Sequence, residues 1–133
     1  MDLDDIRDSF AFFDDWEDKY RFVIDLGKSL PHLEEALRTE DNLVRGCQSQ
    51  VWLVSATVGD RLHLRIDSDA HIVRGLISIV LAAYQDRTPE DILAFDMEEL
   101  FSDLDLLTHL SPTRGNGLRA MVSRIRETAR AAA

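Results

Sequence analysis

The segment Gln50–Asp67, QVWLVSATVGDRLHLRID, contains two runs of strand-forming residues separated by a turn. Val51–Val58 is rich in β-branched and aromatic residues, and Gly59-Asp60 is a dipeptide typical of turns. Arg61–Asp67 then alternates polar and apolar side chains, as expected of a strand with one buried face. The pattern predicts an antiparallel hairpin. The sheet has either these two strands alone or a short third strand at Leu43-Val44.

The flanking sequence indicates helices on both sides of this hairpin. The segment from about Ala70 to Tyr84 is apolar on nearly every face, which predicts a buried helix capped by Ser68 or Asp69. Apolar residues at helical spacing indicate two further helices before the hairpin, and capping residues mark helix starts after it. These segments are Ile6–Phe13, Trp16–Gly27, and the starts at Thr88-Pro89, Asp96 and Ser111-Pro112, whereas Leu33–Asn42 is expected to be a loop.

These elements predict an α+β fold: a small antiparallel sheet of two to three strands with helices packed on one face. The chain shows no repeat, linker or low-complexity segment, so residues 1–133 are expected to form a single domain.

The charge balance excludes several classes of protein. The 133 residues include 15 Lys and Arg against 25 Asp and Glu, giving a formal net charge of −10. Such acidity argues against binding to nucleic acid and to anionic membranes. The N-terminal residues have no signal-peptide pattern, so a cytoplasmic protein is expected.

Cys47 is the single cysteine, which excludes an internal disulfide. It lies between Gly46 and the polar trio Gln48-Ser49-Gln50, immediately before the predicted hairpin. This loop context leaves two interpretations open, a small buried side chain or a reactive thiol. Gly46 would allow a close approach to the loop, and Arg45 would favour the thiolate.

A Cys–His hydrolase would need a base, and the chain offers His32, His63, His71 and His109. None forms a recognisable nucleophile–base signature with Cys47, and a surface or capping role explains each more simply. Asp67 and Asp69 suggest either a metal or acid/base pair, or simply a strand end followed by a helix cap.

Several motifs in register resemble the SufE family, the sulfur acceptors that work beside cysteine desulfurases. The segment GCQSQVW at 46–52 is similar to the family signature, and the order and spacing agree from about Trp16 to Arg126. The other matching segments are DSDAHIVRGL at 67–76, Tyr84, RTPEDI at 87–92, Phe95-Asp96 and HLSPTRGNGL at 109–118. Arg45 and His71 depart from the residues that are common in the family.

The resemblance implies a SufE/IscU-like two-layer domain and a sulfur carrier. Cys47 would accept persulfide sulfur from a SufS- or CsdA-type desulfurase, stimulate that enzyme, and pass sulfur to a SufBCD-type iron–sulfur scaffold. Pyridoxal phosphate would belong to the desulfurase, so this chain would bind no cofactor and no metal. It would be a monomer or weak dimer alone, and a transfer partner rather than an enzyme in the strict sense.

The resemblance also implies that Asp69 and Arg114 belong to the surroundings of the thiol loop. From the loop sequence itself, Arg45, Gly46, Gln48, Ser49 and Gln50 are expected as supporting residues, the last three donating hydrogen bonds either to the loop or to a sulfur anion. We expect Arg114 to stabilise either the thiolate or the loop carbonyls, since its position at a helix start has no dipole rationale. Gly115 and Gly117 indicate either close packing beside the loop or an irregular helix start. Two alternatives remain, an iron–sulfur scaffold and an independent thiol hydrolase, although one cysteine is few for a cluster.

Overall fold

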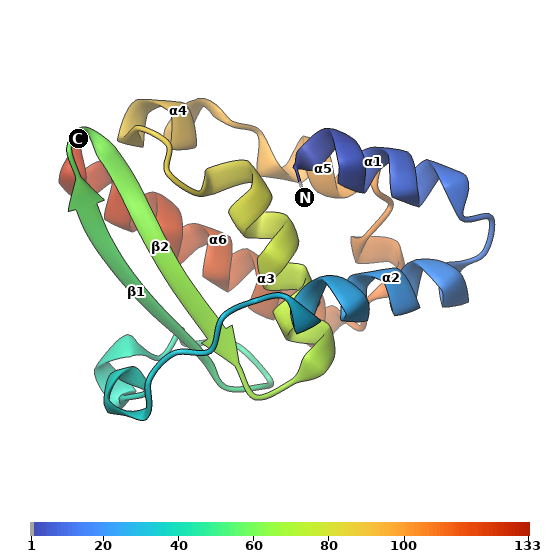
Figure 1. The fold of residues 1–133 in the computed structure, drawn as a ribbon, viewed down its shortest axis with the longest axis horizontal. Coiled ribbons are helices and arrows are strands. Elements are labelled where there is room, and N and C mark those ends of the chain that lie inside the picture. The colour runs from blue at the N-terminus through green and yellow to red at the C-terminus, as the bar shows by residue number, and fades with distance from the viewer. Residues whose placement is uncertain (1) are drawn as a thin grey trace.

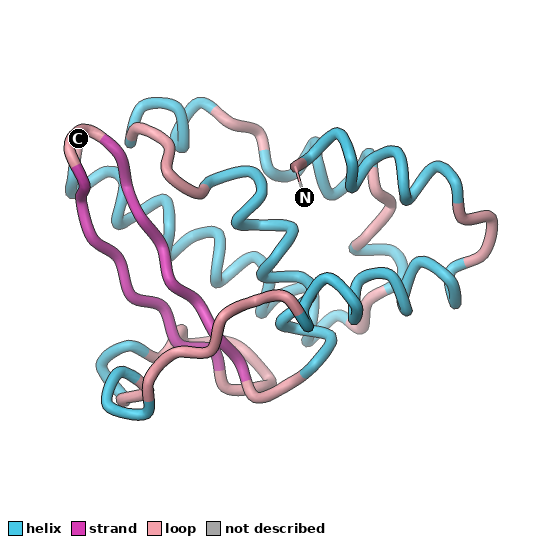
Figure 2. The backbone as a smooth tube through the Cα atoms, in the orientation of Figure 1, coloured by secondary structure: helices cyan, strands magenta, loops and turns pink. Residues whose placement is uncertain are grey.

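The computed structural model describes residues 2–133 and contains a two-stranded hairpin with helices on either side of it in the chain. Figures 1 and 2 show the helices gathered to one side of the hairpin. In chain order the helices and strands are α1 (Leu3–Phe12), α2 (Trp16–Lys28), β1 (Val51–Val58), β2 (Arg61–Ser68), α3 (His71–Tyr84), α4 (Pro89–Ala94), α5 (Met97–Asp103) and α6 (Pro112–Ala132). The α+β class predicted from the sequence is confirmed.

The hairpin has the predicted strands and turn. Its register runs from Val51 opposite Ser68 to Val58 opposite Arg61, and Gly59 takes a positive φ of 64° in the turn. The optional third strand is reduced to a single bridge between Leu43 and Trp52, so the sheet has two strands. This single bridge holds the segment before the thiol against the start of β1, with the Val44 N–H donating to the Val51 carbonyl at 2.8 Å.

Helix α3 forms the centre of the core. Ten of its fourteen residues are buried, among them Ile77, Val80 and Tyr84 with no exposed surface. Its backbone lies very close to α2: a Cβ added at Gly75 would come within 1.9 Å of the Val23 carbonyl oxygen. Glycine at 75 is therefore needed for the two helices to pack at this distance.

The helix starts follow the predicted caps, with one correction. Thr88, Asp96 and Ser111 each accept a hydrogen bond from a backbone N–H in the first turn of α4, α5 and α6. The expected cap of α3 is wrong. Ala70 stands at the N-cap without a side-chain hydrogen bond, because Ser68 and Asp69 accept from other backbone groups.

The segment before the hairpin is more ordered than the expected loop over Leu33–Asn42. It contains two short 3-10 turns, η1 (Glu35–Leu37) and η2 (Glu40–Asn42), and a third, η3 (Leu107–His109), precedes α6.

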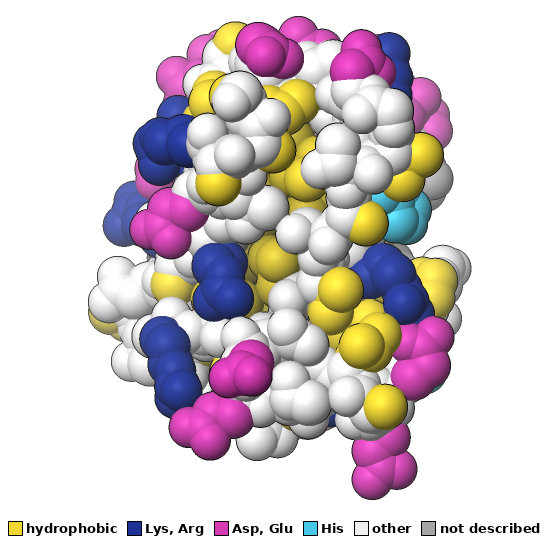
Figure 3. Space-filling model, turned by 90° about the vertical axis from the view of Figure 1, so that its left-hand side faces the viewer, with side chains coloured by type: hydrophobic (Ala, Val, Ile, Leu, Met, Phe, Trp, Pro, Cys, Tyr) yellow, Lys and Arg dark blue, Asp and Glu magenta, His cyan; other side chains and the backbone are white. Residues whose placement is uncertain are grey.

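Figure 3 shows the hairpin side of the molecule, where acidic and basic side chains surround exposed hydrophobic ones. Over residues 2–133, no helix is both long and apolar enough to cross a membrane.

Candidate functional site

The thiol of Cys47 faces the first turns of α6. Its Sγ lies 3.4 Å from the carbonyl oxygen of Gly117, with the thiol donating, across 70 residues of sequence. The side chain is half-buried and packs against the hydrophobic core. The lone cysteine therefore combines the two interpretations left open by the sequence: it lies on a loop, but its sulfur points inward.

Two glycines allow this close contact between the loop and α6. Gly46 has a φ of +91°, a backbone conformation that residues other than glycine rarely adopt. On α6, a Cβ at Gly117 would lie 3.3 Å from the Cα and 3.5 Å from the Sγ of Cys47. Gly117 thus provides the close packing considered from the sequence, whereas a Cβ at Gly115 would meet only the Leu107 side chain, at an ordinary 3.5 Å.

A small cavity of about 20 Å³ lies beside the thiol. Its wall combines Cys47, Gln48 and Ser49 of the loop with apolar side chains of α3 and α6 and with Arg114. A space of this size holds about one water-sized atom. The site therefore has room for about one water-sized atom next to the sulfur.

Arg114 contributes the single cation to this wall. Its Nη1 atom is buried and has no hydrogen-bond partner among the described residues. An unsatisfied buried donor is costly, and a guanidinium nitrogen bonds most strongly to an anion. Of the two roles expected for Arg114, a hydrogen bond from this nitrogen to a loop carbonyl is not found within residues 2–133.

Burial raises the pKa of the Cys47 thiol above its ordinary value. At neutral pH the resting thiol is therefore mostly protonated and poorly nucleophilic. The expectation that Arg45 would favour the thiolate does not fit the geometry. The Arg45 guanidinium is exposed, pairs with Glu40 at 3.2 Å, and does not line the cavity.

Asp69 connects the far end of the thiol loop to the start of α3. Its carboxylate accepts from the backbone N–H of Gln50 at 3.1 Å, and its own N–H donates to the Gln50 carbonyl at 3.4 Å. Asp69 thus lies at the loop, where the family resemblance placed it, but it bonds to the loop backbone and lies outside the cavity wall. Gln48 and Ser49, by contrast, line the cavity itself.

The four histidines are distributed elsewhere. His32 contacts Asp67, His63 pairs with Asp86 at 2.8 Å, and His109 stacks on the Trp16 ring with centroids 4.2 Å apart. His71 is exposed and lines a separate hollow with Asp69. No histidine within residues 2–133 lines the thiol cavity, so a Cys–His pair has no geometric support.

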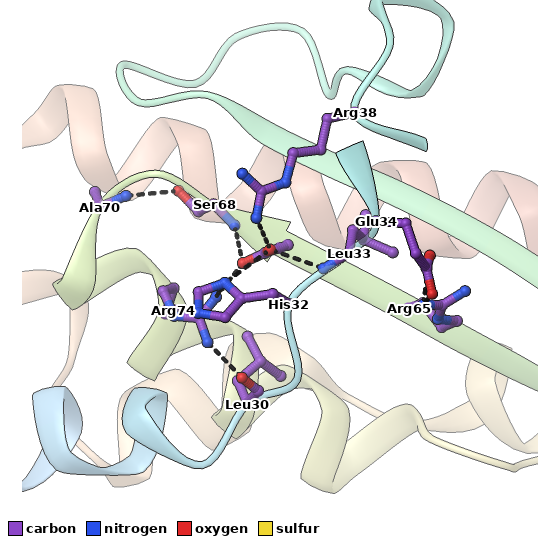
Figure 4. A network of polar contacts seen from close by, with 10 residues as sticks. Leu30, His32, Leu33, Glu34, Arg38, Arg65, Ser68, Ala70 and Arg74 are labelled. Atoms are coloured by element: carbon purple, nitrogen blue, oxygen red, sulfur yellow. Dashed lines mark hydrogen bonds and ion pairs between the residues drawn. The ribbon is translucent and has the colours of Figure 1, made fainter. Parts of the chain in front are cut away.

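Asp67 is the centre of a polar cluster that sequence reasoning missed. Its carboxylate has no exposed surface and contacts Arg74, Arg38 and His32 (Figure 4). It also accepts from the N–H groups of Leu33, at 2.9 Å, and Ser68, at 2.8 Å. Burial alone would raise the pKa of this carboxyl, but the two N–H groups and Arg74 outweigh it and lower the pKa below its usual value.

The Asp67 cluster explains why the outer face of the hairpin is buried near its base. Asp67 lies directly opposite Trp52 in the register, and the Arg38 guanidinium covers the Trp52 ring at 5.4 Å from its centroid. Trp52 is 7% exposed and therefore buried, as expected, but it lies on the outer face of the hairpin and is not part of the main hydrophobic cluster. Within the described part of the chain, no group of three or more acidic, histidine or cysteine side chains is arranged to hold a metal ion.

Comparison with known proteins identifies the family. Residues 4–129 match the model of the SufE family, described as an Fe-S metabolism associated domain. An uncharacterized SufE-like protein of Rhizobium etli is 55% identical over 132 residues, covering 96% of this chain and 89% of the relative. A second, from Rhizobium meliloti, is 50% identical over 131 residues and covers 96% and 94% of the two chains.

A solved structure supports the fold independently. The solution structure of a hypothetical protein from Thermus thermophilus superimposes with a TM-score of 0.75, covering 99% of this chain and 98% of that one. At 18% identity this likeness concerns the fold alone. The family model and the two relatives show that the chain belongs to the SufE family.

Proposed function

We propose that this protein is a sulfur acceptor and carrier that uses Cys47 in iron–sulfur cluster assembly. The observation that carries the proposal is the cavity beside the thiol, whose wall includes both Cys47 and Arg114, an arginine with a buried Nη1 atom that has no partner among residues 2–133. Membership of an Fe-S metabolism associated family supports the same conclusion. The sulfur donor is a cysteine desulfurase of the SufS or CsdA type, whose own active-site cysteine carries a persulfide.

The transfer step is an exchange between sulfur atoms. The Cys47 thiol first loses its proton, and the thiolate attacks the outer sulfur of the donor persulfide. A new S–S bond forms at Cys47 while the S–S bond on the donor breaks, and the donor cysteine leaves as a thiolate that takes up a proton. The transferred sulfur keeps its oxidation state, so no external oxidant or reductant is required.

The loop must move for this attack to occur. A cavity of about 20 Å³ cannot admit a cysteine from a second protein, and the thiol points into it. The contacts that hold the loop inward are few: the Gly117 carbonyl at the sulfur and Asp69 at Gln50. We infer that docking of the desulfurase turns Cys47 outward, where its pKa falls because burial no longer raises it.

After transfer, the loop returns with one additional sulfur atom. The cavity has room for about one such atom, and Arg114 then acts as the counter-ion of the deprotonated persulfide. Shelter in an apolar pocket protects the sulfur from reductants until the acceptor, a SufBCD-type scaffold, receives it. By emptying the donor cysteine, the protein also stimulates the desulfurase, all within the cytoplasm.

The test uses intact-mass measurement. The protein is mixed with a SufS-type or CsdA-type desulfurase, pyridoxal phosphate and cysteine, and its mass is recorded before and after reduction. We expect one added sulfur atom that reduction removes and that is absent from Cys47→Ser. The absence of this adduct with both desulfurases would overturn the proposal, as would an equal adduct on the Cys47→Ser variant.

A further inference from the structure

The chain that leads into the thiol loop runs along helix α6 in the opposite direction to the helix. A Cβ added at Gly46 would lie 3.4 Å from the Ala120 side chain, one turn beyond the contact of Cys47 with Gly117. One further turn along α6, Arg124 contacts the chain before Gly46. Residues three and four apart share one face of a helix, so a single face of α6 supports the chain up to the thiol.

Arg124 holds this chain by two backbone carbonyl groups. Its Nη1 atom donates to the Leu43 carbonyl and its Nη2 atom to the Asp41 carbonyl, both at 3.4 Å. Because the guanidinium is planar and rigid, two bonds from different nitrogens fix the direction of the chain as well as its position. The helix dipole does not explain an arginine here, since its effect is confined to the last turn and α6 continues to Ala132.

The chain is also fixed on either side of the thiol loop. Before the loop, the Val44 N–H donates to the Val51 carbonyl at 2.8 Å, and after it the Gln50 N–H donates to a carboxylate at 3.1 Å. Between these two points, the backbone of residues 45–49 makes no hydrogen bond to any helix or strand of the described chain. The thiol loop is therefore a short segment with two fixed ends, and Arg124 supports the first of them.

We propose that Arg124 is a positioning residue for sulfur transfer, which fixes the base of the thiol loop on α6 so that only residues 45–49 turn outward. This inference rests on the function proposed above. Cys47 lies three residues after Val44, and three residues span at most about 10 Å. With its base fixed, the loop therefore presents the sulfur within a small region close to α6. A group held in this way loses less freedom when it meets the donor persulfide, which accelerates the attack.

Arg126 on the same helix offers a matched control. Its Nη1 atom donates to the carbonyls of Ile92 and Leu93 at 3.4 and 3.3 Å, so it makes the same kind of bond to the backbone at the end of α4. It lies outside the wall of the thiol cavity. Arg126→Ala therefore loses as many hydrogen bonds as Arg124→Ala without releasing the thiol loop, and denaturant unfolding should show similar losses of stability in the two variants.

Alkylation of Cys47 and amide exchange in the free protein test the anchor directly. In Arg124→Ala we expect Cys47 to react with a small alkylating reagent about three- to tenfold faster, since two hydrogen bonds that favour the closed loop are lost. The Val44 amide should exchange faster by a similar factor. Arg126→Ala should leave both rates unchanged. Equal rates in Arg124→Ala and the original chain would overturn the proposal, as would the same increase in Arg126→Ala.

Sulfur uptake from a saturating SufS-type desulfurase, followed by intact mass over time, separates positioning from simple loosening. Arg124→Ala should take up sulfur about three- to tenfold more slowly, although its thiol is more accessible, because the sulfur is no longer presented in one place. Arg124→Lys keeps the charge and should recover part of the rate. Uptake by Arg124→Ala at or above the original rate would overturn the positioning role. If the original chain itself acquires no sulfur, the proposed function fails, whereas the alkylation and exchange rates still decide whether Arg124 fixes the loop.

Discussion

Two arginines reach into the interior of this protein, and they are held in opposite ways. Arg74 on α3 is 6% exposed and donates to the Asp67 carboxylate and to the Leu30 carbonyl. Arg114 on α6 keeps a buried Nη1 atom that no other described residue satisfies. The charge of Arg74 is compensated within the fold. The buried nitrogen of Arg114, in contrast, has no partner within residues 2–133.

The difference separates a structural role from a functional one. A buried ion pair with all its hydrogen bonds made is stable in the resting protein and is damaged by removing either partner. An unpartnered buried donor costs stability in the resting protein and regains it when a ligand arrives. A substitution in the Asp67 cluster is expected to lower the free energy of unfolding strongly, whereas one at Arg114 should change it only slightly. For sulfur transfer we expect the opposite: the larger effect at Arg114.

The largest effect on stability is expected from Asp67→Asn. It leaves Arg74 and Arg38 without their anion, and breaking such a buried pair costs about 3–5 kcal/mol of unfolding free energy. The lowered pKa of Asp67 makes this loss dependent on pH. The stabilisation is complete above the unfolded-state pKa of about 3.9 and disappears as the pH falls through the lower folded-state value. Denaturant unfolding at neutral and acidic pH measures it, and the gap between the two proteins should narrow in acid.

Asp86→Asn is the matched control for that prediction. Asp86 also pairs with a histidine, His63, but its side chain is 58% exposed. An exposed pair contributes at most about 1 kcal/mol, so this variant should remain close to the original protein at every pH. Equal losses in the two variants would show that the Asp67 cluster is no more important than a surface ion pair.

An intermediate effect is expected from Gly117→Ala. Alanine favours a helix over glycine by up to about 1 kcal/mol, but here the added Cβ presses on Cys47 and the loop must shift. We expect little or no net stabilisation, together with faster alkylation of Cys47 because the thiol is displaced toward solvent. Gly115→Ala is the control, since its Cβ meets only ordinary contact, and it should stabilise α6 without changing the alkylation rate. Identical behaviour of the two variants would contradict the proposed contact.

The sequence predicted the parts of the molecule that have a regular pattern. The hairpin, the buried helix α3 and the position of Cys47 on a loop all follow from alternation, helical spacing and capping residues. The burial of Asp67 did not follow, because the residues that cover it, Leu30–Arg38, have no periodic pattern and their path is set by the tertiary structure. The raised pKa of Cys47 has the same origin, since the sulfur is buried by a helix 70 residues away.

The smallest effect on stability, and the clearest effect on sulfur transfer, is expected from Arg114→Ala. Because Nη1 has no partner in the resting protein, its removal should change the unfolding free energy by less than about 1 kcal/mol. The persulfide, however, loses its counter-ion, so the sulfur adduct on Cys47 should form more slowly and be reduced more quickly. Arg114 also lines the cavity of the resting thiol, so the alkylation profile of Cys47 should move to higher pH.

Arg119→Ala is the control that isolates this role of Arg114. Arg119 lies on the same helix, but its guanidinium is exposed and pairs with Glu98 at 2.9 Å, away from the thiol. Its loss should leave both the adduct and the alkylation profile unchanged. If Arg114→Ala instead unfolds the protein as readily as Asp67→Asn does, the two arginines are both structural and the contrast between them fails. If it is stable and accepts sulfur at the original rate, Arg114 is not the counter-ion, and the cavity beside Cys47 shelters the sulfur by its apolar wall alone.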